Sequence, residues 1–304
     1  MYILLTLLIL IILFVLACYA IYCYTFRRIN FRQATPYDIP DSDNKERIRH
    51  NILSLMDTPF EGVTIKSRDN LNLYGRYYHF HDKAPIALMF HGYRSNAFRD
   101  GNGGFKIARE YGLNVLLCDQ RAHGKSEGRV ITFGVKERYD CLEWVNYLKT
   151  RFGNDVKIIL IGLSMGAATV MMASDIVPAE NVKGIVADCG FSSPKEILED
   201  VAKQKKIPSK LAYFFIKLGA RLFGNFNPEE ASSVASLTKS TIPVLFIHGE
   251  GDDFVPCSMS HSCHKVCISE KYIFTVPEAT HGMSFYMDSQ GYTKAVNEFL
   301  EKVL

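Results

Sequence analysis

The stretch from Lys157 to Ala168 has the sequence KIILIGLSMGAA, and it decides the fold expected for this chain. After its lysine it begins as a compact apolar run of the kind that forms a buried strand. Gly162 to Gly166 then fit the pattern G-x-S-x-G, which places a serine on a sharp turn between a strand and a helix. Both glycines are needed because side chains there would clash with neighbouring backbone. We therefore expect Ser164 to be lifted above the end of a sheet as a nucleophile.

Segments typical of strands and of helices alternate on both sides of this stretch. Strand-like runs cover residues 86–90, 114–118, 157–161, 183–187, 243–247 and 271–276, and helix-like ones 104–111, 135–152, 167–176 and 292–304. Before them, residues 63–65 and 71–74 flank a turn signal at 68–70 and predict a hairpin. The alternation predicts an α/β fold with a mostly parallel central sheet and helices on both faces.

A serine hydroxyl becomes a good nucleophile only beside a base, and histidine is the usual one. Where this turn carries catalysis, the chain order is serine, then an acid, then histidine. His281 lies in a loop after the last strand-like run and is the predicted general base. Four other histidines fit the order or the position less well: His79, His81, His261 and His264.

The acid of such a triad belongs just after the strand that precedes the histidine's strand. Residues 243–249 lead into Asp252 and Asp253, which both qualify by order, and Asp188 offers an alternative one strand earlier. We favour Asp252. Its role is to hold the imidazole tautomer and to stabilise the imidazolium ion.

An oxyanion hole needs two backbone donors near the nucleophile. The N–H of Met165, directly after the serine, is one candidate, and the N–H of Tyr93, after the run at 86–90, is the other. The side chain of His91 is then expected to buttress this loop. No cofactor is implied, because a triad and an oxyanion hole suffice for acyl transfer.

Six short motifs in this order resemble those of the α/β-hydrolase superfamily: HG at 91–92, DQRAHGKS at 119–126, GLSMG at 162–166, HGEGD at 248–252, VP at 255–256 and HG at 281–282. The resemblance runs from about residue 60 to the end. It is nearest to the monoacylglycerol-lipase and serine-aminopeptidase-like branch, which includes membrane-anchored bacterial hydrolases and eukaryotic relatives. It implies an α/β-hydrolase fold and serine hydrolase activity.

The resemblance also bears on single residues. In that family two residues and Val-Pro follow the acid, which supports Asp252 over Asp253. Ala122 stands where the family often has glycine, in a loop whose role is structural. Asp119 and His123 lie in the same loop and are therefore not predicted to be catalytic.

Residues 192–240 interrupt the alternation and are too long for an ordinary loop. Apolar and aromatic residues mix there with lysine and arginine between Lys210 and Phe223. Two interpretations are open: a helical insertion packed on the core, or a lid whose apolar face contacts an acyl chain or the membrane.

Residues 1–26 contain no charged residue and are long enough to span a bilayer as a helix, and we predict a transmembrane anchor outside the fold. A cleavable signal peptide and a lipoprotein signal at Cys18 are the competing interpretations, but a positive start and a polar sequence after the cysteine are both missing. Arg27, Arg28 and Arg32 follow, so the positive-inside rule predicts a cytoplasmic hydrolase domain. Residues 27–58 are expected to be a polar tether with a helix at 45–56, and residues 59–304 the hydrolase domain.

Composition excludes several other classes. The net charge of +3 gives no reason to expect a nucleic-acid partner. The cysteines do not have the density of a disulfide-stapled domain, and we expect buried thiols, which favours a reducing compartment. Crowded cysteines and histidines at 257–267 lack the spacing of a zinc site, so no metal is predicted.

The leading hypothesis is therefore a carboxylesterase or lipase-like enzyme that cleaves a carboxylic ester, lipid-like or otherwise acyl, through an acyl-enzyme on Ser164. A serine peptidase or amidase uses the same triad. A non-catalytic binding protein on the same scaffold is the third hypothesis. The expected partners are a small-molecule substrate and the membrane.

Overall fold

The computed structural model describes residues 2–28 and 44–304. Its centre is a sheet with the strand order β1-β2-β4-β3-β5-β6-β7-β8. The strands are β1 (Glu61–Lys66), β2 (Asn72–Tyr78), β3 (Ile86–Phe90), β4 (Asn114–Cys118), β5 (Ile158–Leu163), β6 (Val182–Asp188), β7 (Val244–Gly249) and β8 (Lys271–Val276). The hairpin β1–β2 joins β4 antiparallel, and the remaining pairs are parallel. This confirms the predicted mostly parallel sheet.

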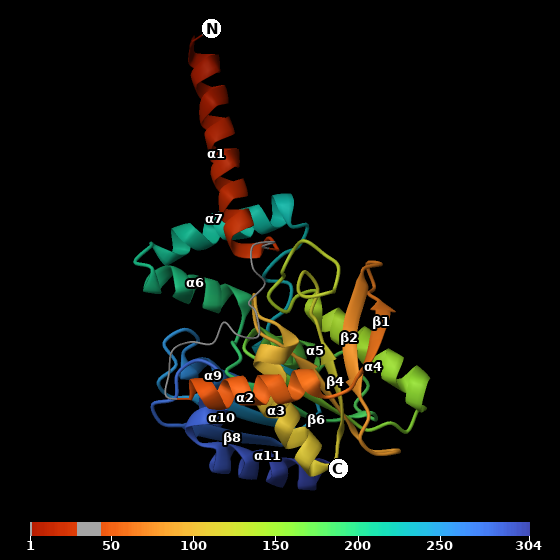
Figure 1. Cartoon of the computed structure of the whole chain (residues 1–304). Helices are drawn as coiled ribbons and strands as arrows, with labels where there is room; N and C mark the ends of the chain where they lie inside the picture. The colour runs from red at the N-terminus through yellow and green to blue at the C-terminus, as the bar shows by residue number, and fades with distance from the viewer. Residues whose placement is uncertain (1, 29–43) are drawn as a thin grey trace.

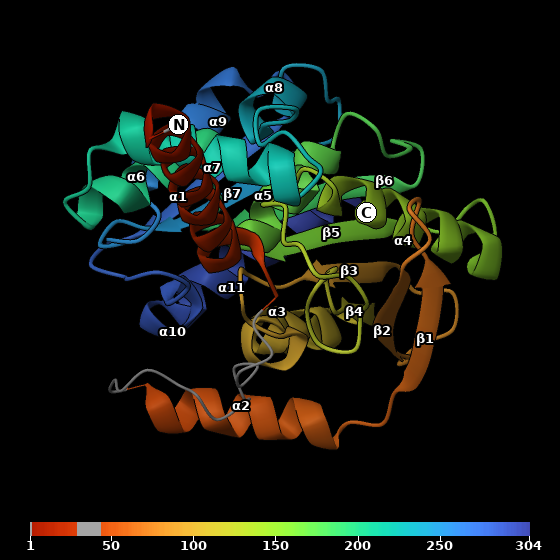
Figure 2. The ribbon, with the colours of Figure 1, turned by 90° about the horizontal axis from the view of Figure 1, so that it is seen from above.

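The inner strands are mostly apolar and buried, as expected where helices cover both faces of the sheet. Figure 2 shows the molecule from above, with the sheet between two sets of helices. On one face, α4 (Glu137–Phe152), α5 (Met165–Ala173), α8 (Ser233–Leu237) and α9 (Cys257–Val266) enclose a core around Trp144. On the other, α2 (Lys45–Asp57), α3 (Ala97–Tyr111), α10 (Ser284–Met287) and α11 (Ser289–Val303) enclose a second core around Phe105 and Phe299.

Helix α3 begins seven residues before the predicted segment at 104–111. Asn96 caps it by accepting the N–H of Arg99 at 3.0 Å. Gly101, Gly103 and Gly104 look like helix breakers in sequence, but here they let the helix approach its neighbours. A Cβ at Gly103 would come within 2.8 Å of the Phe285 ring. Tertiary packing therefore outweighs the weak helix propensity of glycine.

The insertion at 192–240 forms two longer helices, α6 (Pro194–Gln204) and α7 (Ser209–Phe223), followed by α8. Both lie over the end of the sheet that carries Ser164, between the domain and the N-terminal helix α1 (Tyr2–Phe26), as Figure 1 shows. They share a third core with the chain at 122–135 and with Met165. The insertion therefore packs on the domain and also covers the candidate site.

Helix α1 projects from the domain on the side opposite the C-terminus (Figure 1). Its 25 residues are long and apolar enough to cross a membrane, and its first four turns are exposed. Its last turns differ from the expectation of an anchor outside the fold, because Cys18, Tyr22 and Phe26 are buried against the domain. Of the predicted tether, residues 29–43 with Arg32 lie outside the described residues, while α2 matches the helix predicted at 45–56.

Candidate functional site

Ser164 occupies the turn between β5 and α5 in a left-handed backbone conformation, with φ of 56°. This strained conformation persists because the surrounding backbone packs too closely for the turn to relax. A Cβ on Gly162 would lie 2.2 Å from the carbonyl oxygen of Gly166, and one on Gly166 would lie 2.1 Å from that of Phe90. The Ser164 N–H donates to the Asp188 carbonyl at 2.8 Å. The turn thus presents the hydroxyl at the carboxyl end of the sheet.

His281 reaches this hydroxyl from the loop after β8. Its Nε2 lies 2.9 Å from Ser164 Oγ, and its Nδ1 lies 2.7 Å from Asp252 Oδ2. With Nδ1 assigned as the donor to the carboxylate, Nε2 is free to accept the serine proton. The Phe254 ring packs edge-on against the imidazole, with centroids 5.1 Å apart. The three side chains form one unbroken chain of hydrogen bonds.

Asp252 is held as a carboxylate although it is buried. Its Oδ1 accepts the N–H groups of Phe254 and Val255 at 3.0 and 2.8 Å. Burial alone would raise its pKa, but hydrogen bonds with His248 and His281 hold the pKa well below its usual range. A group that stays ionised and buried beside an imidazole can orient its tautomer and stabilise the imidazolium.

The two alternative acids stand apart from the histidine. Asp253 is exposed next to Asp252. Asp188 is buried and accepts a hydrogen bond from Tyr292 at 3.0 Å through Oδ2, while its Oδ1 has no partner among the described residues. Burial raises the pKa of Asp188 to about 6, although the Tyr292 hydroxyl opposes the shift. The geometry thus places Asp252, and neither alternative, on His281.

The Asp188→Asn variant is expected to change how stability depends on pH. A folded-state pKa of about 6 lies above the unfolded value. The contribution of this group to stability is therefore complete below about pH 4 and is lost as pH rises through 6. Asparagine cannot ionise. The free energy of unfolding of the variant should therefore rise relative to that of the wild type between pH 4 and 7, by about 3 kcal/mol at most.

Denaturant unfolding in detergent at pH 4, 5, 6 and 7 measures this difference. The Asp253→Asn change at an exposed neighbour of the triad is the matched control. A constant difference for Asp188→Asn would show that the carboxyl is already ionised in the folded protein at pH 4.

The loop after β3 carries the predicted second oxyanion donor, the N–H of Tyr93. Two buried histidines hold it, with ring centroids 4.8 Å apart. His91 Nε2 accepts the N–H of Gln120, and His123 Nε2 accepts the N–H of Arg94, both at 3.0 Å. Burial lowers the pKa of His123 well below its usual range, so its ring is neutral and can accept. The first predicted donor, the N–H of Met165, opens α5, where an N–H has no acceptor inside the helix.

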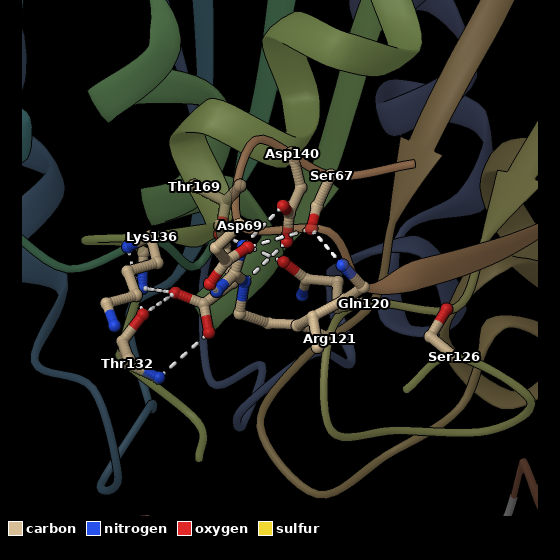
Figure 3. A network of polar contacts seen from close by, with 12 residues as sticks. Ser67, Asp69, Gln120, Arg121, Ser126, Thr132, Lys136, Asp140 and Thr169 are labelled. Atoms are coloured by element: carbon tan, nitrogen blue, oxygen red, sulfur yellow. Dashed lines mark hydrogen bonds and ion pairs between the residues drawn. The ribbon is translucent and has the colours of Figure 1, made fainter. Parts of the chain in front are cut away.

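The segment at 119–126 contacts this loop through Gln120 and His123, and ion pairs hold the segment in place. Arg121 forms paired bonds to Asp140, both at 2.6 Å, and to Asp69, at 2.9 and 3.0 Å (Figure 3). The Arg76 guanidinium likewise donates two hydrogen bonds to the Asp119 carboxylate, at 3.0 and 3.2 Å. Asp119 and His123 are thus tied to structural partners, in agreement with their exclusion from the predicted catalytic residues.

Two cavities meet at Ser164. One, of about 250 Å³, extends towards α3, and polar groups such as Asp100, Asn102 and Asp188 lie among the apolar residues that line it. The other, of about 470 Å³, lies under α6 and α7 and is almost wholly apolar. We call them the polar chamber and the apolar chamber. The larger has the size of a small-molecule site.

The apolar chamber includes residues that the sequence analysis missed. Ile21, Tyr24 and Thr25 come from the last turns of α1, and Phe254 comes from the loop after Asp252. No local pattern could have assigned the first three, because the segment has the composition of a membrane span.

One cluster in the described residues has ligand atoms close enough to hold a metal ion, namely Cys189, Asp252 and His281. Asp252 and His281 already bind each other, and His281 also binds Ser164. Burial raises the pKa of Cys189 well above its usual range, so the thiol is uncharged, whereas a metal needs the thiolate. The cluster does not fit a metal. All eight cysteines are free, with Cys263 and Cys267 buried and His261 exposed.

Comparisons with known proteins agree with this architecture. A family model described as alpha/beta hydrolase fold matches residues 96–226, which include Ser164. The uncharacterized protein YqkD of Bacillus subtilis is 27% identical over 268 residues, which cover 86% of this chain and 85% of that protein. Protein bem46 of Schizosaccharomyces pombe is 27% identical over 254 residues, covering 79% and 76%. An esterase from Pyrococcus furiosus, Pf2001, superposes with a TM-score of 0.67 at 23% identity, covering 87% and 96%.

Proposed function

We propose that this chain, which has an α/β-hydrolase fold, hydrolyses carboxylic esters through an acyl-enzyme on Ser164. The observation that carries the proposal is the hydrogen-bond chain from Asp252 through His281 to the serine hydroxyl, at 2.7 and 2.9 Å. Nucleophile, base and orienting acid come from three different loops at the carboxyl ends of β5, β7 and β8. An ordinary structural serine has no need of such an arrangement.

Acylation begins when Ser164 Oγ attacks the ester carbonyl carbon and its proton passes to His281 Nε2. The N–H groups of Met165 and Tyr93 then receive the negative carbonyl oxygen. As the tetrahedral intermediate collapses, the bond from carbon to the alcohol oxygen breaks, and that oxygen takes the proton from Nε2. Asp252 stabilises the imidazolium while it exists.

Deacylation repeats these steps with water. His281 takes a proton from the water, whose oxygen adds to the acyl carbon. The bond to Ser164 Oγ then breaks, the serine regains its proton from Nε2, and the carboxylic acid leaves. Every proton is returned, so no co-reactant besides water is required.

The two chambers support an ester with an apolar acyl group. The apolar chamber suits a hydrocarbon chain, since burying one there removes apolar surface from water. The polar chamber offers oxygen and nitrogen groups to a hydroxylated alcohol. Asp188 Oδ1, buried and without a partner in the described chain, is a candidate acceptor for such a hydroxyl.

A panel of p-nitrophenyl acyl esters and aminoacyl p-nitroanilides tests the proposal on the full chain in detergent. We expect kcat/KM for the best ester to exceed that for every anilide. Faster anilide turnover would replace the esterase by a serine amidase or peptidase with the same triad. If folded protein turns over neither class, a binding role on this scaffold takes precedence.

We further propose that α1 anchors the domain on the cytoplasmic face of a membrane. Arg27 and Arg28 directly follow the helix, and the Arg28 N–H donates to the Arg129 carbonyl at 2.8 Å. The arginines and the domain therefore lie on one side, which the positive-inside rule assigns to the cytoplasm. Protease protection of a tag on the C-terminus in sealed inverted vesicles would refute this orientation.

A further inference from the structure

The apolar chamber has a wall that does not belong to the hydrolase domain in sequence. Its floor is Ser164 with Met165, and its roof is made of α6 and α7 residues such as Ile197 and Phe215. The remaining side is closed by Ile21, Tyr24 and Thr25, from the last two turns of α1. The helix that is apolar enough to cross a membrane therefore also borders the space next to the nucleophile.

This wall is fixed to the loop that carries the predicted oxyanion donor. The Tyr93 hydroxyl donates to the Thr25 carbonyl at 2.8 Å, and the Arg94 guanidinium donates to the Tyr24 carbonyl. The Ile131 N–H donates to the Phe26 carbonyl at 2.7 Å. Carbonyls at the end of a helix need such donors, and here Tyr93 and Arg94, which line the chamber, supply two of the three.

Helix α1 also packs tightly against the roof. A Cβ on Gly219 of α7 would lie 2.9 Å from the Cys18 carbonyl oxygen and 3.1 Å from the Tyr22 Cβ. Three aromatic pairs join the two helices: Phe14 with Phe215 at 5.5 Å, Tyr19 with Phe223 at 5.1 Å, and Tyr22 with Phe223 at 5.8 Å between centroids. These contacts pack α1 directly against α7, and the two helices border the chamber together.

The rim of the chamber combines apolar and basic groups. Tyr24, Ile207 and Leu211 line the chamber and are 64%, 48% and 56% exposed. Four exposed lysines lie around them at the α6–α7 connection: Lys203, Lys205, Lys206 and Lys210. Apolar groups beside lysines next to a membrane-spanning helix suit the headgroup layer of a bilayer.

We infer that the last two turns of α1 form one wall of a binding site for a long acyl chain, so that the anchor itself sets acyl-chain specificity. The substrate class is a single-chain amphiphile whose ester lies at Ser164 and whose hydrocarbon tail lies between α1, α6 and α7. This inference rests on the proposed esterase function and adds the residues that select the acyl chain.

The test compares adjacent residues of α1 in the full chain, reconstituted in phosphatidylcholine vesicles. Ile21→Trp replaces an aliphatic side chain of the chamber wall by a larger indole ring. Ala20→Trp is the matched control, because Ala20 is exposed and does not line the chamber. The measured quantity is the ratio of kcat/KM for p-nitrophenyl palmitate to that for p-nitrophenyl acetate.

We expect this ratio to fall at least about tenfold in Ile21→Trp and to stay at the wild-type value in Ala20→Trp, since overfilling a packed apolar site is costly. An equal ratio in both variants would overturn the inference, as would a wild type that cleaves the acetate but not the palmitate. A wild type that cleaves no ester would instead defeat the proposed function.

A second variant guards against misfolding of Ile21→Trp. Ile21→Ala adds no bulk and removes part of the wall, so it should raise KM for the palmitate relative to the acetate at least about threefold, through lost apolar contact. If melting temperatures show that Ile21→Trp is unfolded, Ile21→Ala decides alone, and an unchanged chain-length profile refutes the role of α1.

Discussion

Replacement of Ser164 by alanine is expected to abolish covalent labelling by a fluorophosphonate probe and to lower kcat for the best ester by about 10,000-fold to 1,000,000-fold. The reason is that the variant keeps the chambers and the oxyanion donors but has no oxygen that can attack the carbonyl. Binding and electrostatic stabilisation alone leave only a small residual rate over water. Labelling is read from a gel, and turnover from the ester panel.

The control is Ser258→Ala. It removes an exposed hydroxyl of α9, and Ser258 lines neither chamber. It should label and turn over as the wild type does. Folding of Ser164→Ala is checked by its melting temperature, since the missing hydroxyl leaves the glycine-lined turn in place. Persistent labelling of the folded variant would mean that another residue is the nucleophile.

Asp252→Asn is expected to lower kcat by about 1,000-fold to 10,000-fold while KM changes little. An amide has nearly the same shape as the carboxylate, so the packing is kept. However, its NH₂ group can donate to His281 Nδ1, which leaves the proton on Nε2, where the serine proton must be accepted. The neutral amide also gives no charge to stabilise the imidazolium ion.

The same measurement on Asp253→Asn and Asp188→Asn separates the three acids that the sequence left open. Asp253→Asn should stay within about twofold of the wild type, because its carboxylate is exposed to water and screened there. If Asp188→Asn loses more kcat than Asp252→Asn, the orienting acid is Asp188 at the end of β6 and not Asp252.

Much of the fold could be predicted because its signals are local. The inner strands are short apolar runs, which is the pattern typical of parallel strands covered by helices on both faces. The turn at Ser164 needs glycine at 162 and 166 for steric reasons that act within a few residues. The sequence predicts only the second half of α3, because what stabilises its first half is not local. Its glycines pack against Phe285 and other residues far along the chain.

For the candidate site, the motifs and their order along the chain predict Ser164, His281 and three candidate acids. Order alone could not choose among the acids, because Asp252 and Asp253 are neighbours with the same chemistry. In the structure the Asp252 carboxylate contacts His281 at 2.7 Å and is held by two backbone N–H groups, which supports the preference for Asp252.

Tertiary structure alone also decided that the end of α1 borders the chamber at Ser164. An apolar helix has the same composition whether lipid or protein surrounds it, so hydropathy predicts that it is removed from water but not which groups cover it. Only the packing of Gly219, Tyr93 and Phe223 against its last turns distinguishes an anchor that merely holds the domain from one that shapes its site.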